Sequence, residues 1–202
     1  SARAQRRSAQ YASALGSGLN LTLSTVNAVS IVASTNQLVN IIAAQSTIVA
    51  TTTVTANGSI AGRGLDLTET VMTTGGTLTA TGNNGTNIVL STGTVLTAGN
   101  LSATGSALGS GISMIASKIT TINAVAVGTN QLTNISALQS IIICGLLSAS
   151  SSVMGAGVSL SASNLMAGVI TASTNSAENL VAIESAVECA GAITANIAGL
   201  SA

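Results

Sequence analysis

The sequence predicts a mainly β protein, a β-solenoid-like array of four repeats of about 46 residues each. Three observations support this fold class. A Gly-x-Gly motif returns at nearly constant spacing, short runs alternate apolar and polar residues, and the composition offers only small aliphatic side chains for a core.

The Gly-x-Gly motif is followed each time by an apolar, a polar and another apolar residue, and its first glycines lie 46, 47 and 46 residues apart. An Asn-x-x-x-Asn pair follows each copy. Four copies in phase indicate a repeat architecture with structural turns. The repeated positions are Gly16, Gly18, Gly62, Gly64, Gly109, Gly111, Gly155 and Gly157, with Asn36, Asn40, Asn83, Asn87, Asn130, Asn134, Asn175 and Asn179.

The repeats divide the chain. Residues 1–12 form a basic N-terminal arm, and the four repeats are 13–58, 59–105, 106–151 and 152–196. The joint between units recurs at 193–199, so we expect residues 197–202 to begin a truncated fifth repeat or to form a cap.

The composition favours a narrow, regularly stacked interior. The sequence has no Phe, Trp, His or Pro, and its Lys and Arg residues number 5, as do its Asp and Glu residues. A chain with so many apolar and so few charged residues buries a core. This core has no aromatic side chains to fill irregular gaps.

Short β-strands fit the local pattern. Alternation runs through 19–23, 65–67 and 158–160, and Thr-rich runs such as 51–55 have high strand propensity. Gly and Asn between these runs supply the positive φ angles of tight turns. Two coils of about 23 residues or one larger coil both fit the period.

A helical or α+β repeat array is the alternative. From Asn175 onward apolar residues recur every three or four positions, with Asn175 or Ser176 as an N-cap and Glu178 in the first turn. A C-terminal helical cap on a β-array would combine both patterns. The apolar residues of this run are Leu180, Ile183, Val187, Ala190, Ile193 and Ile197.

The residues for common catalytic sites are missing. Without histidine, the most common general base and catalytic metal ligand are excluded. Asp66 and Glu69 could act as acid and base or hold calcium, but such a pair on a β-run is more often a solvated face. We therefore expect no enzyme, no cofactor and no metal.

Two partner classes are also not expected. No apolar run approaches the 18 or so residues of a transmembrane helix, so we predict no transmembrane span. A basic surface interleaved with aromatic residues is missing as well, so we predict no nucleic-acid partner.

Cys144 and Cys189 occupy the same position in consecutive repeats. If a repeat is one coil, they lie about 4.8 Å apart, within reach of a disulfide. If it is two coils, the separation doubles and a disulfide is excluded. The alternative to a disulfide is that the two cysteines are buried and act as small apolar residues.

Stacking also brings the Asn pairs above one another. Their amides can form a hydrogen-bonded ladder that satisfies turn backbone groups, which is a structural role. A polar binding row is the functional alternative.

Charged residues give the array a polarity. Opposite charges at the two ends would let subunits join head to tail into an open filament. The alternative is that they protect exposed end coils from unwanted strand pairing. The residues are Arg3, Arg6 and Arg7 at one end, and Glu178, Glu184 and Glu188 near the other.

The run 75–105 (GGTLTATGNNGTNIVLSTGTVLTAGNLSATG) resembles the β-helical repeats of filamentous-haemagglutinin-type secreted adhesins, which alternate small aliphatic residues with Thr, Ser, Gly and Asn. The resemblance implies an extracellular structural or adhesive role and no catalytic residue. The Thr-x-Thr runs at 51–55 and 77–81 resemble the ice-binding faces of insect antifreeze solenoids.

We expect a structural subunit that assembles with itself, end to end, into an extracellular or cell-surface filament, sheath or adhesive fibre. The alternative is an ice- or glycan-binding module that uses a flat Thr/Asn-rich face.

Overall fold

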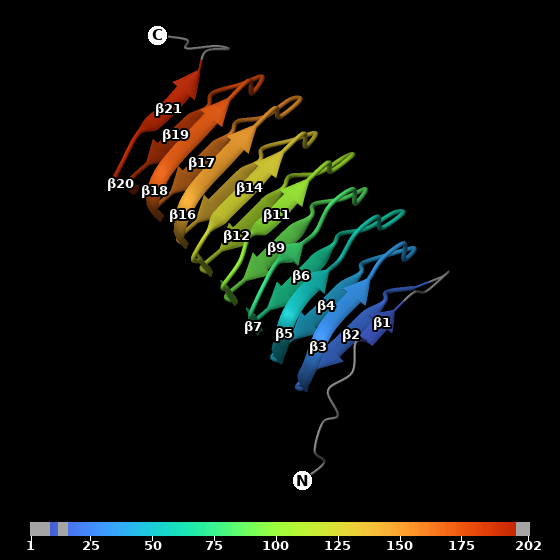
Figure 1. Ribbon diagram of the computed structural model, residues 1–202. Helices are drawn as coiled ribbons and strands as arrows, with labels where there is room; N and C mark the ends of the chain where they lie inside the picture. The colour runs from blue at the N-terminus through green and yellow to red at the C-terminus, as the bar shows by residue number, and fades with distance from the viewer. Residues whose placement is uncertain (1–8, 12–15, 197–202) are drawn as a thin grey trace.

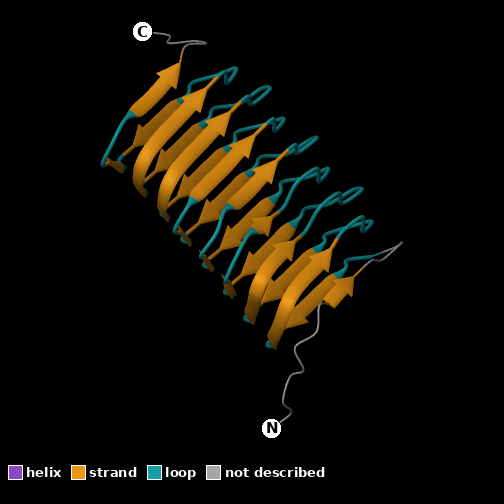
Figure 2. Ribbon diagram, viewed as in Figure 1, coloured by secondary structure: helices purple, strands orange, loops and turns teal. Residues whose placement is uncertain are grey.

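The computed structural model describes residues 9–11 and 16–196, and the regular structure in these segments consists of strands without a helix (Figure 2). Their strands stack into an elongated rod in which the chain advances steadily from one end to the other (Figure 1). The predicted fold class is confirmed: the protein is a β-solenoid, and the described part of the chain forms about eight turns.

One side of each coil is a four-residue strand in a parallel eight-stranded sheet. In these strands the first and third residues point into the core and the second and fourth point outward. The strands are β2 (Leu19–Thr22), β4 (Ile41–Ala44), β6 (Leu65–Thr68), β9 (Ile88–Ser91), β12 (Ile112–Ile115), β15 (Ile135–Leu138), β17 (Val158–Ser161) and β19 (Leu180–Ile183).

The rest of each coil lies in a 13-stranded sheet whose described pairings are all parallel. Some coils contribute one long bent strand, and others two short strands separated at the bend (Figure 1). These strands are β1 (Ala9–Tyr11), β3 (Thr25–Ala33), β5 (Thr47–Thr55), β7 (Val71–Thr74), β8 (Leu78–Thr79), β10 (Thr94–Thr97), β11 (Leu101–Thr104), β13 (Lys118–Thr121), β14 (Ala124–Gly128), β16 (Ile141–Ser150), β18 (Asn164–Ser173), β20 (Ala186–Cys189) and β21 (Ile193–Asn196).

Each repeat of the sequence makes two coils. Successive strands of the eight-stranded sheet begin 22 to 24 residues apart, which is half the spacing of the Gly-x-Gly motifs. We number the coils 1 to 8 by these strands, so that coil 1 begins at β2 and coil 8 at β19. The Asn pairs end the odd coils, and the Gly-x-Gly motifs end coils 2, 4 and 6.

The core consists of columns of small aliphatic side chains. Ile88, Ile112 and Ile135 stack at one position of three consecutive coils, each with 0% exposure. Alanine fills another column, as at Ala80 and Ala103. Parallel strands stack about 4.8 Å apart, so each column must keep a similar volume from coil to coil. This confirms the narrow interior expected from the composition.

The turn after each four-residue strand contains a non-glycine residue in the left-handed region. Its backbone N–H donates to a carbonyl of the next coil, as Gln45 does to Thr68 at 3.0 Å. This bond helps to hold a conformation that costs energy for residues other than glycine. Gly and Asn were expected at such turns, but these positions hold Leu23, Gln45, Glu69, Thr92, Ala116, Gln139, Ala162 and Glu184, with φ between 46° and 50° at seven of them and 53° at Thr92.

The helical predictions were wrong. The segment predicted as a helical cap forms β19, β20 and β21. Leu180 and Val187 do face the core, but Ile183 points outward with 59% exposure. Short strands joined by tight turns therefore produce an apolar spacing that resembles a helical period without a helix. Within the described residues, no helix could cross a membrane.

Candidate functional site

The asparagine pairs form one continuous column of amide hydrogen bonds through the solenoid. Within each pair, the first Nδ2 donates to the second Oδ1, and the second Nδ2 donates to the first Oδ1 of the next pair. The distances are 2.6 to 3.1 Å. In order, the column is Asn36, Asn40, Asn83, Asn87, Asn130, Asn134, Asn175 and Asn179, and all but Asn179 have 0% exposure. The ladder predicted from the sequence is present.

The same amides satisfy backbone groups of the intervening coil. Asn83 Oδ1 accepts from the backbone N–H of Ser59 at 2.9 Å, and its Nδ2 also donates to the carbonyl of Ala56 at 3.1 Å. The equivalent bonds recur at Asn130 and Asn175. Because buried backbone groups without partners are costly, the column supplies the bonds that the sheets do not make at this corner.

The second glycine of each Gly-x-Gly motif makes room for this column. A Cβ on Gly64 would lie 2.6 Å from Asn83 Nδ2 and 2.6 Å from the carbonyl oxygen of Asn87. Gly18 and Gly157 are in the same situation against Asn36 and Asn175. A coil that ends in an Asn pair therefore needs, as the coil before it, one that ends in Gly-x-Gly. This explains why the sequence repeats over two coils rather than one.

A second column, of hydroxyl groups, follows the turn after the eight-stranded sheet. Each hydroxyl donates to the carbonyl two residues earlier, and from Ser46 on each also accepts from the backbone N–H of the same position in the preceding coil, as Ser140 does for Ser117. The column is Ser24, Ser46, Thr70, Ser117, Ser140, Ser163 and Ser185, with Gly93 in place of a hydroxyl in coil 4. Sequence reasoning missed this column, although its spacing of 22 to 24 residues marks the single coil.

In the last described coil of the solenoid, the core positions are partly exposed. Among the described residues, β19, β20 and β21 each pair with a neighbour on one side only. Ile193 is 51% exposed, whereas Ile170, which stacks on it, has 0% exposure. Core-facing Leu180 and Val187 are only partly buried. This layer of strand edges and apolar side chains, which we call the end coil, is the first candidate for a functional site.

Three carboxylates lie in the end coil or next to it. Glu178 lies in the loop before it, Glu184 in its turn and Glu188 on β20, and all three are exposed. The opposite group, Arg3, Arg6 and Arg7, lies outside the described residues, as do the arm at 1–8 and the remainder at 197–202. The structure therefore shows the position of the three glutamates but not that of the three arginines.

The remaining carboxylates do not form a joint site. Asp66 pairs with Arg63 at 2.5 Å, and Glu69 accepts from Gln45 at 2.8 Å. Each carboxylate thus has its own partner on a neighbouring position of the surface. Among the residues that the structure describes, no cluster of three metal-ligating side chains occurs.

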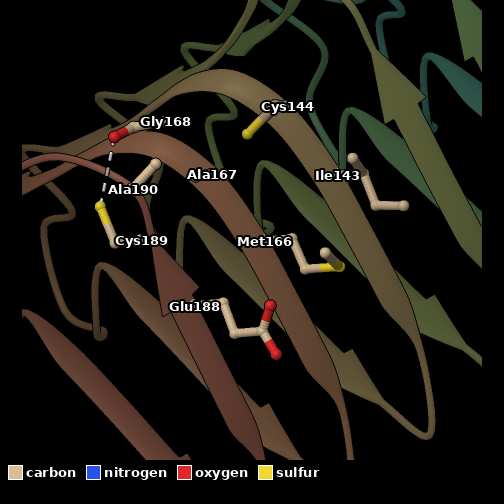
Figure 3. Close-up of a pocket in the computed structure, with 8 residues that line it drawn as sticks. All are labelled: Ile143, Cys144, Met166, Ala167, Gly168, Glu188, Cys189 and Ala190. Carbon is tan, nitrogen blue, oxygen red and sulfur yellow. Dashed lines mark hydrogen bonds between the residues drawn. The ribbon is translucent and has the colours of Figure 1, made fainter.

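The cysteines lie two coils apart. Ala167 stands between them, in register with Cys144 on one side and Cys189 on the other, and both thiols are free. The two-coil alternative therefore holds, and it excludes a disulfide within the chain. Figure 3 shows the two sulfurs separated by the strand that carries Ala167. Burial, and to a lesser extent the nearby Cys189, raises the pKa of the Cys144 thiol to about 11.

A hollow of about 400 Å³ lies beside the cysteines, at the bend of coils 6 to 8 (Figure 3). Met166 and Glu188 lie on neighbouring strands at its border, and Gly168 and Ala190 line it at the bend. Its lining is mainly apolar.

The fold and the two polar columns define a class: a β-solenoid repeat protein in which a coil that ends in an Asn pair alternates with one that ends in Gly-x-Gly. No protein-family model matches the chain, and no curated protein or solved structure matches it either.

Proposed function

We propose that the protein is a structural subunit that assembles end to end into an extracellular or cell-surface filament, sheath or adhesive fibre. The observation that carries this proposal is the end coil. Its strand edges have a neighbour on one side only among the described residues, and its core positions are partly exposed. Edges of this kind are templates for pairing with another chain.

Parallel stacking gives the contact its geometry. A further coil placed on β19, β20 and β21 would continue both sheets with about 4.8 Å between strands. It would also cover Leu180, Val187 and Ile193. A contact between one end of a copy and the opposite end of the next does not close, so it produces an open filament.

Charge supports the same direction of assembly. Glu178, Glu184 and Glu188 are exposed around the end coil, and the arginines at 3, 6 and 7 lie near the other end of the sequence. Head-to-tail contact brings opposite charges together, whereas contact between two C-terminal ends brings carboxylates together.

The variant Ile193→Lys tests this proposal, with filament formation measured by electron microscopy. A lysine at this position would place an unpaired charge in the contact, so we expect filaments to be lost. Ile60→Lys is the matched control, because Ile60 is 59% exposed and lies in a loop at the side of the rod. Normal filaments from Ile193→Lys, or equal loss in both variants, would reject the end coil as the contact.

A second function is favoured by one observation in the structure. Thr53 and Thr55 of coil 2 stand in register with Thr77 and Thr79 of coil 3 on one outward face. The hydroxyls are spaced by two residues along the strand and by one coil across it, a regular array suited to ice or a glycan. Thermal hysteresis that is lost in Thr55→Leu/Thr79→Leu would support this function, and its absence in the unmodified protein would reject an ice-binding role.

A further inference from the structure

Apart from the end coil, the solenoid has an apolar surface along the outer face of the 13-stranded sheet. Exposed large apolar side chains gather there over coils 4 to 7, namely Leu96, Ile122, Ile141, Leu146, Met166 and Val169. The most prominent is Ile122 at the bend of coil 5, which is 72% exposed. Contiguous exposed apolar residues of this kind mark interaction sites. We call this surface the side patch.

Two hollows lie at the C-terminal part of the side patch. The larger, of about 400 Å³, is at the bend of coils 6 to 8, where Ala190 holds the position that Ile122 holds in coil 5. The smaller, of about 150 Å³, is lined by Asn164, Ala186 and Glu188 among others. Ala186 holds the position that Lys118 holds in coil 5.

Ile122 also borders a third hollow, of about 310 Å³, which lies over coils 3 to 5. The projecting groups of coil 5 and the two hollows that reach coil 8 are related by their places in the stack of coils. Ile122 and Lys118 belong to coil 5, and the matching positions of coil 8 are at the two hollows. Coils 5 and 8 lie equally far from the boundary between β16 in coil 6 and β18 in coil 7. A twofold axis at that boundary, parallel to the strands, exchanges coil 5 of one copy with coil 8 of the other.

We propose that the side patch binds a second copy of this chain, side by side and antiparallel, about this twofold axis. Ile122 of each copy enters the larger hollow of the other. Lys118 of each copy lies directly opposite Ala186 of the other copy and extends over the smaller hollow. There it reaches Glu188 of the other copy, which is two residues along the strand from Ala186. Because the surface is self-complementary, each contact is made twice.

The charged residues of this sheet favour a second copy of the chain over an unrelated apolar partner. Lys118 and Glu188 are the described charged residues on the outward positions of this sheet in coils 5 to 8, and they carry opposite signs at opposite ends of the side patch. An antiparallel copy matches the two charges, whereas a parallel copy opposes like charges. Four coils of strands with up to ten residues give a footprint on the order of 600 Å² per copy, so we expect micromolar affinity.

A zero-length carbodiimide cross-linker provides the direct test, because Lys118 is the only lysine of the sequence. Within one chain, Lys118 and Glu188 are three coils apart, about 14 Å, which is too far for direct coupling. We expect a Lys118–Glu188 cross-link in the dimer band. In a mixture of ¹⁴N- and ¹⁵N-labelled protein, it should join light to heavy peptides. A dimer without this cross-link would contradict the pairing.

Charge reversal separates this contact from end-to-end assembly. Lys118→Glu should weaken the dimer about tenfold or more in sedimentation equilibrium, and Lys118→Glu/Glu188→Lys should restore it. Lys118 is not part of the end coil, so filaments of Lys118→Glu should still form as single rods. Failure of the double variant to restore the dimer would overturn the side pairing and leave the end contact unaffected.

Ile122→Asp tests the apolar half of the contact. We expect the dimer to dissociate about tenfold or more readily. Leu108→Asp is the matched control, since Leu108 is 67% exposed but lies in the loop that ends coil 4. Equal dimer affinities for the two variants would contradict the insertion of Ile122.

Discussion

At the residue scale, the amides of the asparagine column hold the corner of the solenoid. Each fully buried Asn bonds to the amides above or below it and to backbone groups of the coil between them. Loss of one amide leaves several buried groups without partners at once. Such a loss costs more than the net contribution of the bond itself.

We therefore predict that Asn87→Ala lowers the free energy of unfolding by about 2–4 kcal/mol. Its side chain joins Asn83, Asn130 and the carbonyl of Thr104. Asn164→Ala, at an exposed position, should change stability by less than about 0.5 kcal/mol. Urea denaturation measures both, and equal effects would contradict the role of the column.

Two glycines of the polar columns should respond in opposite ways to serine. Gly93→Ser fills the gap in the hydroxyl column, with a Cβ 3.2 Å from the carbonyl oxygen of Thr70, a contact that a small shift relieves, so we predict a gain of about 0.5–1 kcal/mol. Gly64→Ser forces a Cβ against Asn83 and should lower the melting temperature. A decrease in melting temperature for both variants would contradict the assignment of Gly93 as a gap in the column.

At the element scale, the coil is a short strand, a tight turn and a bent strand, and much of it could be predicted from the sequence. Alternation at 19–23 and 158–160 identified strands, and the Gly-x-Gly spacing identified the repeat. The number of coils per repeat stayed open, because Gly and Asn alternate between coils and hide the shorter period. The hydroxyl column, at Ser117, Ser140 and Ser163, carries that period.

The helical cap was predicted wrongly for a reason that belongs to the element. Residues 180–193 contain apolar side chains at helical spacing, but hydrogen bonds to the preceding coil determine their conformation. Local propensity is a weak prior compared with such tertiary contacts. The end coil as a surface also could not be predicted, because exposure depends on which coils lie next to it.

Stacking also places the two thiols in different environments, which predicts different reactivity. With a pKa of about 11, Cys144 is almost entirely protonated at pH 8, and its thiolate fraction rises only as the pH approaches that value. We predict that iodoacetamide labels the more accessible Cys189 first. Mass spectrometry of the labelled peptides measures this, and equal labelling rates at pH 8 would contradict the burial of Cys144.

At the scale of the whole molecule, the rod has sides and ends with different roles. Its sides consist of paired strands and outward Ser and Thr residues interrupted by the side patch, and the strands of the end coil have a neighbour on one side only among the described residues. The two proposed contacts use different surfaces, and Glu188 of coil 8 lies at the border of both. End contact lengthens the assembly, and side contact pairs rods, so the combination would produce a fibre thicker than one solenoid.

The polarity of charge predicts a salt-dependent end contact. The triple variant Arg3→Gln/Arg6→Gln/Arg7→Gln should shorten or abolish filaments, and high salt should do the same to the unmodified protein. Arg63→Gln is the control, because Arg63 pairs with Asp66 of its own chain. Light scattering and electron microscopy measure the assembly, and unchanged filament lengths in the triple variant would contradict the charge contact.

The central claim is that stacked coils continue from one copy into the next. Electron microscopy of the purified protein at micromolar concentration, with diffraction from any fibres, tests it most directly. We predict filaments with a spacing of about 4.8 Å along the filament axis, because strands run across the rod and coils stack along it. Dispersed single rods, or filaments without that axial spacing, would contradict the claim.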